Sequence, residues 1–251
     1  ARTRGTNLGG RGGQGRTGLG PTAAGMSAGR AGNGVGIAGT APGAKLCVAR
    51  GFKPDASGGE PTANLADVKA GIEWVVSQGA QVVNLSVGVE SQGVCLLCGN
   101  GQNPLGPAIE EAWNNGVLPV LASGNNNDQV FGGGPGFANL DAIVVGATNR
   151  DDSVANYSVG LGNAKYGIVA PGGDAVSATD ARCTDSTRTD CPMVLSTYAG
   201  TSCDSSAPER CYAYLAATSM AAPHVSGAPG VPFARGLTRD QVCDTLLATA
   251  D

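Results

Sequence analysis

Residues 216–227 read Ala-Ala-Thr-Ser-Met-Ala-Ala-Pro-His-Val-Ser-Gly, and the rest of the chain is arranged around this stretch. Small residues surround a serine, and a proline follows it four positions later, which suits the first turns of a helix. The free backbone N–H groups and the dipole at a helix start favour negative charge that develops nearby. We therefore predict a nucleophile at Ser219. Close packing of a small-residue helix against a sheet is the structural alternative.

Residues 218–225, Thr-Ser-Met-Ala-Ala-Pro-His-Val, resemble the nucleophile motif of the subtilases, the subtilisin-like serine proteases. The resemblance implies that Ser219 is the catalytic nucleophile of a serine endopeptidase acting on extended peptide or protein substrates. Independently of it, apolar runs of helical and strand type alternate along the chain, as in α/β proteins. We expect an α/β fold with a mostly parallel central sheet and helices on both faces, as in subtilisin.

Length and composition indicate one compact domain. A chain of 251 residues with no internal linker fits a single peptidase domain over residues 1–251, of which residues 1–23 are atypical for the family. Charged residues make up only 14% and glycines number 41, which favours tight turns and close packing. The net charge of −4 gives no attraction to nucleic acid, and no apolar run approaches the roughly eighteen residues of a membrane span. We expect a soluble monomer that binds neither.

The eight cysteines indicate an oxidising compartment. Cys183 and Cys191 are eight positions apart, as are Cys203 and Cys211, which predicts two short loops closed by disulfides. We therefore expect a secreted, extracellular protein. No signal peptide is visible, so the sequence reads as a mature or trimmed form.

The remaining cysteines leave more alternatives open. Cys95-Leu-Leu-Cys98 suits a redox pair or half of a zinc site, but a zinc site normally needs four ligands and His224 is the only histidine. A structural disulfide or two separate pairings fits better. Cys47 and Cys243 are candidates to pair with each other, although eight cysteines allow about 105 connectivities.

The first 18 residues contain four arginines among glycines and almost no apolar side chains, so they cannot form a core element alone. Arg11-Gly12-Gly13 would suit a nucleic-acid-binding arm of the RGG type. The acidic balance of the whole chain disfavours that alternative.

From Ala24 the sequence resembles the subtilase segment in which the helix with the catalytic histidine runs into a glycine-rich loop, here residues 32–42, and then a strand, here residues 44–50. The family's His-Gly-Thr-His-Val-Ala-Gly run ends on Ala24-Gly25, which puts Leu19 at the position of the histidine. A leucine has no lone pair to accept the serine proton, so the general base is missing.

The aspartate that orients the histidine in the family precedes it in the chain, yet the first aspartate here is Asp55. A sequence error, a truncated start and a real loss of activity each explain this gap and Leu19 together. The alternative function is a non-catalytic pseudoprotease scaffold that binds extended peptides.

Two further segments resemble parts of the subtilase site. Residues 84–88 resemble the strand whose edge pairs with extended substrate, and residues 122–125 resemble the segment in which an asparagine, here Asn125, donates to the oxyanion. A core strand and a turn-forming asparagine are the structural alternatives. The candidate substrate-binding residues are Ser86, Val87, Gly88, Ala122, Ser123 and Gly124.

Hydrophobic periodicity predicts the other elements. Helices are expected over residues 62–79, 107–115 and 237–250, and strands over residues 81–87, 117–122, 142–148, 166–171 and 195–198. Pro229 and Pro232 should end or kink the helix that carries Ser219. Thr238 suits the N-cap of the last helix.

His224 and a possible calcium site complete the candidates. His224 lies five positions after Ser219, which puts it roughly 140° around a helix, so we expect a packed, hydrogen-bonded histidine and not the base. Calcium is the one cofactor that the resemblance suggests, because residues 32–36 resemble a subtilase loop that ligates it through an asparagine and backbone carbonyls. A calcium site needs about six oxygens, carboxylates among them, so a tight glycine turn is the alternative.

Overall fold

The computed structural model describes residues 19–51, 63–86, 105–125, 137–177, 179–184, 189–199, 203 and 211–250. Its centre is a parallel sheet of four strands in the order β1-β2-β3-β4. The strands are β1 Val82–Leu85, β2 Leu118–Ala122, β3 Ile143–Thr148 and β4 Tyr166–Pro171. All three strand pairs are parallel, with Leu85 opposite Leu121 and Ala122 opposite Val145.

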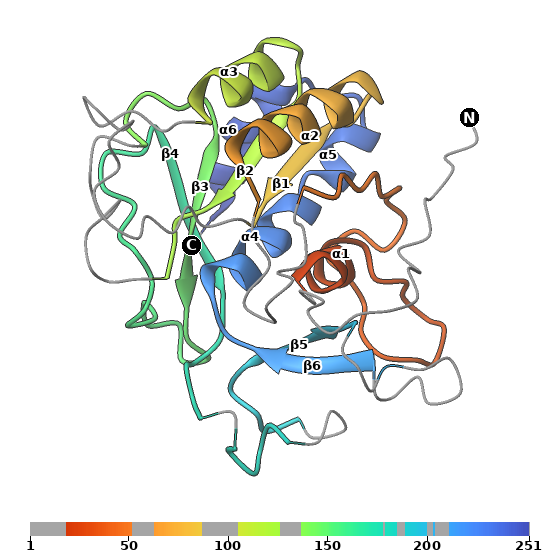
Figure 1. The fold of residues 1–251 in the computed structure, drawn as a ribbon, viewed down its shortest axis with the longest axis vertical. Coiled ribbons are helices and arrows are strands. Elements are labelled where there is room, and N and C mark those ends of the chain that lie inside the picture. Colours follow the sequence, from red (N-terminus) through yellow and green to blue (C-terminus); the bar gives the residue numbers. More distant parts are fainter. Residues whose placement is uncertain are drawn as a thin grey trace.

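Helices cover both faces of this sheet (Figure 1). One face packs Val83, Leu121 and Val144 against α2 Leu65–Ser77 and α3 Gly106–Asn114. The other packs Val120 and Val145 against α4 Thr218–Gly227 and α6 Arg239–Thr249. Because successive residues of a strand point to opposite faces, apolar residues at every position bury both sides of the sheet. The expected α/β fold is confirmed.

Local signals explain where the outer helices begin. The Asn64 side chain accepts a 2.7 Å hydrogen bond from the Asp67 N–H at the start of α2. Thr238 and Gln241 form a capping box at the start of α6, so the predicted N-cap is confirmed. The predicted helix end is also confirmed, because α4 stops at Gly227 and a separate short helix, α5 Gly230–Ala234, follows.

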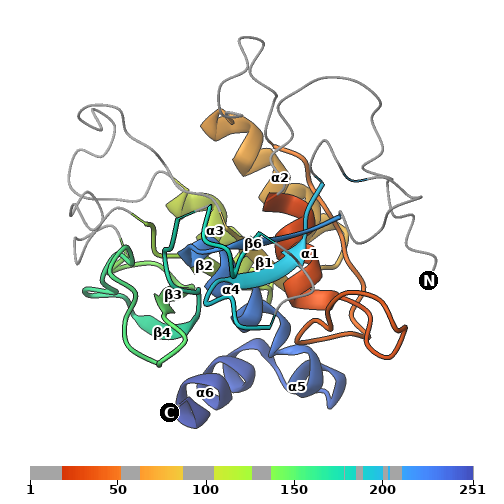
Figure 2. The same cartoon turned by 90° about the horizontal axis from the view of Figure 1, so that it is seen from below.

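A two-stranded antiparallel hairpin, β5 Val194–Thr197 and β6 Tyr212–Leu215, leads into α4. It also contacts α1 Leu19–Ala28, which lies beside α4 (Figure 2). The Thr22 hydroxyl donates to the Thr197 carbonyl at 2.8 Å, and the Ser196 hydroxyl donates to the Thr22 carbonyl at 2.8 Å. Both side chains are fully buried, so these bonds fix the start of α1 on the hairpin.

The strand predicted over residues 44–50 is wrong. This segment has no strand structure, most of its side chains are exposed, and Leu46 keeps 44% of its surface. Within the described chain β1 pairs with β2 alone, so residues 44–50 have no sheet neighbour that would satisfy their backbone groups. They lie instead beside α2, where Ala49 is next to Gly71.

The two predicted loop disulfides, Cys183–Cys191 and Cys203–Cys211, are confirmed. The suggested pairing of Cys47 with Cys243 is wrong, because both thiols are free. Cys243 is buried between α6 and the sheet, where burial raises its pKa to about 11, whereas Cys47 lies on the exposed segment. Cys95 and Cys98 fall outside the described residues, and so does the arginine-rich start, residues 1–18.

No helix in the described ranges has the length and apolar character to span a bilayer.

Candidate active site

The start of α4 is held by an extended residue, Ala217, that bonds at the end of β4. Ala217, the N-cap, has φ −177° and ψ 165°, and its N–H donates to the Gly172 carbonyl at 3.1 Å. Gly172 must be a glycine, because a Cβ there would meet the Ala147 side chain, the Tyr157 hydroxyl and the Ala217 carbonyl. Burial, and then Asp174, raise the pKa of Tyr157 to about 12, so its hydroxyl stays protonated and donates to the Gly173 carbonyl at 2.7 Å.

Small residues let α4 lie close to α1. A Cβ at Gly227 would meet Thr40 and the Ser27 carbonyl, and the Ser27 hydroxyl donates to the Pro223 carbonyl at 3.0 Å. The small-residue run of the motif thus has a packing role as well, as the structural alternative proposed. Close packing is compatible with the predicted nucleophile, because it fixes the helix whose first turn carries Ser219.

Asn125 is bonded to the residue before Ser219. Its Oδ1 accepts hydrogen bonds from the Thr218 N–H at 2.8 Å and from the Thr218 hydroxyl at 2.9 Å. The Thr218 hydroxyl also accepts from the Gly124 N–H at 3.1 Å. With Oδ1 doubly engaged, the Asn125 amide group is fixed in orientation, and its Nδ2 is directed away from Thr218. Asn125 itself is exposed.

Ser219 lies against the end of β1. Its hydroxyl is 3.5 Å from the Ser86 carbonyl, and the Ser86 hydroxyl donates to the Ser219 carbonyl at 3.0 Å. Ser219 keeps 8% of its surface, so it is more enclosed than a residue at the mouth of an open cleft. The structure therefore brings together three of the predicted site residues, Ser86, Asn125 and Ser219, at the carboxyl ends of β1 and β2 and the start of α4. Ligands commonly bind at this edge of a parallel sheet.

The other predicted substrate-binding residues are placed less directly. Ala122 ends β2, and Gly124 follows with φ 110°. The Ser123 hydroxyl is buried and donates to the Val159 carbonyl at 2.9 Å, so its side chain holds the segment after β2 in place. Val87 and Gly88 fall outside the described residues.

The position expected for the general base opens a helix. Leu19 is the first residue of α1, whose first turn is fixed by the buried bonds of Thr22 described above. The single histidine, His224, lies elsewhere, and its Nδ1–H donates to the Met220 carbonyl at 2.9 Å. Burial lowers its pKa, which the bond to Met220 partly offsets, so His224 is a packed neutral imidazole. It has the hydrogen-bonded packing that its position in the helix predicted.

The loop that resembles a calcium-binding segment is a glycine turn. Gly32, Gly34 and Gly36 have φ values of 71°, 71° and 67°, and the Asn33 Oδ1 accepts the Val35 N–H at 3.1 Å. In the part of the chain that is described, no group of three or more His, Cys, Asp or Glu side chains could hold a metal ion. Residues 29–43, which contain this loop, include no carboxylate, so a calcium site here stays a prediction from the resemblance.

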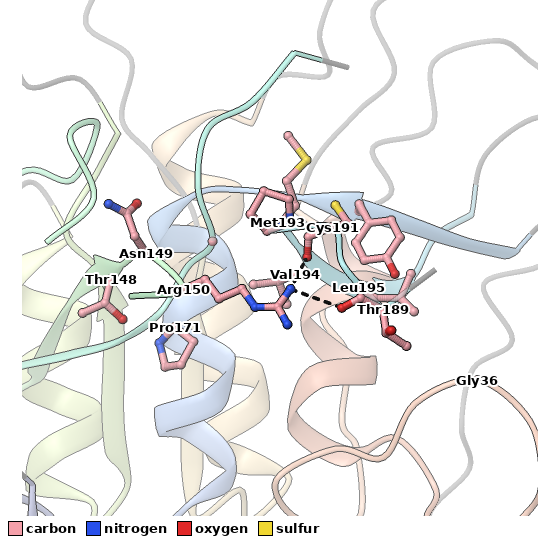
Figure 3. A pocket seen from close by; sticks show the side chains of 13 residues that line it. Gly36, Thr148, Asn149, Arg150, Pro171, Thr189, Cys191, Met193, Val194 and Leu195 are labelled. Atoms are coloured by element: carbon pink, nitrogen blue, oxygen red, sulfur yellow. Dashed lines mark hydrogen bonds between the residues drawn. The ribbon is translucent and has the colours of Figure 1, made fainter. Parts of the chain in front are cut away.

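A cavity of about 530 Å³ lies between the ends of β3 and β4 and the β5–β6 hairpin, but its lining includes none of the candidate site residues (Figure 3). Arg150 extends across it, and its Nη1 donates to the carbonyls of Thr189 at 3.2 Å and Cys191 at 3.3 Å. The Arg150 N–H also donates to the Asp174 carboxylate at 2.8 Å. These bonds hold the loop of the Cys183–Cys191 disulfide on the sheet.

Sequence reasoning missed the hydrogen bonds of three polar side chains around α4: the Thr218 hydroxyl, Asn84 and Ser226. The Asn84 Nδ2 donates to the Ser86 hydroxyl at 2.9 Å, and the Ser226 hydroxyl donates to the Asn84 Oδ1 at 2.9 Å. A single asparagine in the otherwise apolar β1, Val-Val-Asn-Leu, was the signal that could have found this pair.

Residues 14–251 match the Subtilase family. A thermophilic serine proteinase of Bacillus sp. (strain AK1) is 30% identical over 91% of this chain, and thermitase of Thermoactinomyces vulgaris is 30% identical over 95% of it. The chain covers 45% of the first relative and 69% of the second, so it spans about half to two thirds of their length. A solved protease of Pseudoalteromonas arctica has a TM-score of 0.69 at 29% identity, over 95% of this chain and 65% of that one.

Proposed function

Because the chain belongs to the subtilase family, we propose that it descends from, and retains the nucleophile of, a serine endopeptidase that hydrolyses peptide bonds. Ser219 is the proposed nucleophile and Asn125 the proposed oxyanion donor. The observation that carries this assignment is the double hydrogen bond from Thr218 to the Asn125 Oδ1, which joins the end of β2 to the residue before Ser219.

The proposed reaction begins when the Ser219 Oγ attacks the carbonyl carbon of a peptide bond. The carbonyl π electrons move to the oxygen, and the Asn125 Nδ2–H and the Ser219 backbone N–H stabilise the negative charge, because the Thr218 and Met220 N–H groups are bonded to Asn125 and Ala217. In subtilisin, a member of this family, removing the corresponding asparagine costs roughly 3 to 4 kcal/mol of transition-state stabilisation. Asn125 is suited to this role because its amide oxygen, Oδ1, is bonded to Thr218, which fixes the direction of its Nδ2.

Attack breaks the Ser219 O–H bond, and among the described residues no side chain is placed to take the proton, so it passes to solvent water, which also protonates the leaving amine. Leu19 cannot accept it, and His224 is bonded to the Met220 carbonyl. In subtilisin, loss of the histidine alone lowers turnover roughly a millionfold, with residual catalysis from the oxyanion site and substrate binding. We therefore expect this exact sequence to hydrolyse peptides slowly, with a reactivity set by the oxyanion site.

The proposed substrate is an extended peptide that pairs with the backbone at the end of β1. Such pairing adds a strand to a sheet edge and depends on backbone groups more than on side chains. One side of the peptide-binding site would be formed by Ser86, Val87 and Gly88. The other side would be formed by Ala122, Ser123 and Gly124. The two disulfides fit an oxidising compartment, and we propose secretion on that basis.

Labelling with a fluorophosphonate tests the nucleophile. We expect slow but stoichiometric reaction at Ser219, identified by peptide mass spectrometry, and no reaction in Ser219→Ala. Ser177→Ala removes an exposed serine far along the chain and provides the matched control. Labelling of other serines at the rate of Ser219, or none at all with intact fold, would contradict the proposal and favour the non-catalytic peptide binder.

A further inference from the structure

The carbonyl of Ser219 lacks the partner that a helix normally provides. In an α-helix the carbonyl of each residue accepts the N–H of the residue four positions later. For Ser219 that residue is Pro223, which lies inside α4 and has no N–H. A proline ring also crowds the carbonyl four residues before it, here that of Ser219. Since Ser219 is buried, an unpaired carbonyl here would be costly.

The Ser86 side chain supplies the missing donor. Its hydroxyl donates to the Ser219 carbonyl at 3.0 Å, across 133 positions of sequence. Ser86 directly follows β1, so the bond joins the end of the first strand to the first turn of α4. The Ser219 hydroxyl lies 3.5 Å from the Ser86 carbonyl in the opposite direction, so the two residues face each other through both groups.

Two further side chains give the Ser86 hydroxyl its direction. The Asn84 Nδ2 donates to the Ser86 Oγ at 2.9 Å, which leaves the Ser86 proton to point toward Ser219. The Ser226 hydroxyl, two turns along α4, lies 2.9 Å from both the Asn84 Oδ1 and the Ala222 carbonyl, and these two acceptors share its single proton. The Asn84 Oδ1 faces Ser226, so the amide turns its Nδ2 toward Ser86. The hydrogen bonds next to the site therefore run from Asn84 through Ser86 to the Ser219 carbonyl.

We propose that the Ser86 hydroxyl, oriented by Asn84 and Ser226, replaces the helix hydrogen bond that Pro223 removes, and that Ser86 and Asn84 are thereby positioning residues for Ser219. Pro223 leaves the Ser219 carbonyl without its helix hydrogen bond, and the Ser86 hydroxyl supplies a bond to the same carbonyl from outside the helix. The backbone of Ser219 then takes its orientation from β1, the same strand whose end would pair with substrate. The effect on reactivity rests on the proposed nucleophile, whereas the hydrogen-bond replacement does not.

A double-mutant cycle of Ser86→Ala and Pro223→Ala tests the replacement without any use of catalysis. Ser86→Ala removes the side-chain donor to this buried carbonyl, so the folding equilibrium constant from urea unfolding should fall roughly tenfold. Pro223→Ala restores an N–H four residues after Ser219, so in that background Ser86→Ala should cost at most about twofold. Ser86→Thr keeps the hydroxyl and should restore most of the loss. Additive effects of the two alanine substitutions would overturn the proposal.

The labelling rate at Ser219 tests the positioning role. Ser86→Ala and Asn84→Ala should each lower the fluorophosphonate rate about tenfold while circular dichroism shows an intact fold, and Ser86→Thr should recover it. Ser77→Ala is the matched control, because the Ser77 hydroxyl also donates to a helix carbonyl, that of Trp74, but on α2. Coupled stabilities with equal labelling rates would overturn the positioning role. A wild-type chain that takes no label would instead contradict the proposed nucleophile, and the stability cycle would still decide whether Ser86 binds the carbonyl.

Discussion

The first turns of α1 and α4 lie on neighbouring helices and are supported in the same way, yet they carry very different chemistry. Buried hydrogen bonds of Thr22 hold α1 on the β5–β6 hairpin, and those of Thr218 hold α4 on Asn125. The α4 turn presents Ser219, whereas the α1 turn begins with Leu19. The residues that fix a helix in place are thus separate from the residue that would react, so the fixed first turn of α1 can be tested as a support for a general base.

The largest expected effect comes from placing a reactive side chain on the first turn of α1, as there is on the first turn of α4. Leu19→His places an imidazole at the start of α1, and a positioned general base contributes roughly a hundredfold to ten-thousandfold to a rate. We expect a gain of that order in fluorophosphonate labelling, and the rate should rise with pH through about 6.5 as the imidazole loses its proton.

Leu19→Gln is the control for this gain, because glutamine is polar and of similar size but is not a base. Equal labelling rates for the histidine and glutamine variants would show that the start of α1 does not face Ser219. The comparison between the two turns would then fail.

The next largest effect is expected on the α4 side. Asn125→Ala removes the oxyanion donor and should lower the turnover of an activated ester about a hundredfold to a thousandfold in the Leu19→His background, as the corresponding change does in subtilisin. Asn115→Ala, at the exposed end of α3, provides the control. Loss of substrate affinity with unchanged turnover would show that Asn125 binds substrate and does not act on the transition state.

The same substitution at each turn sharpens the comparison further. Thr22→Val and Thr218→Val each remove buried hydroxyl bonds, and each should cost about 1 to 3 kcal/mol of unfolding free energy, measured in urea. Only Thr218→Val should lower Ser219 labelling, about tenfold, because only that hydroxyl orients Asn125. Equal loss of labelling in both variants would mean that general loosening of the fold explains the rate.

The contrast between the two turns also shows which features could be predicted from sequence. The four parallel strands and α4 follow from local patterns: apolar runs, caps and the residues around Ser219. The position of Asn125 follows as well, because the end of a parallel strand is fixed by the sheet. The hydrogen bonds from Thr218 and Ser86 join residues 93 and 133 positions apart, and no local pattern specifies such partners.

Residues 44–50 and the free cysteines show that local sequence also predicts contacts that the structure does not contain. An apolar run becomes a strand only where a neighbouring strand accepts and donates its hydrogen bonds, and within the described chain no neighbour does so. Cys47 and Cys243 are two unassigned thiols in the sequence, but one is exposed and the other lies inside the core. Pro223 removes one N–H from α4, and the structure identifies Ser86 as the donor to the Ser219 carbonyl.

The smallest effect is expected at His224, and it tests whether the only histidine is structural. Burial lowers the pKa of His224 below its ordinary value of about 6.5, so between the two values the unfolded chain binds a proton that the folded chain does not. The contribution of His224 to stability is therefore fully present above about pH 6.5 and is lost as the pH falls toward the folded pKa, with a slope of at most about 1.4 kcal/mol per pH unit. Urea unfolding of the wild type and of His224→Gln from pH 5 to 7.5 measures this, because their difference removes the titration of the carboxylates. A difference that does not change with pH, or a labelling rate at Ser219 that falls in His224→Gln, would show that His224 is not a neutral, packed residue with a structural role alone.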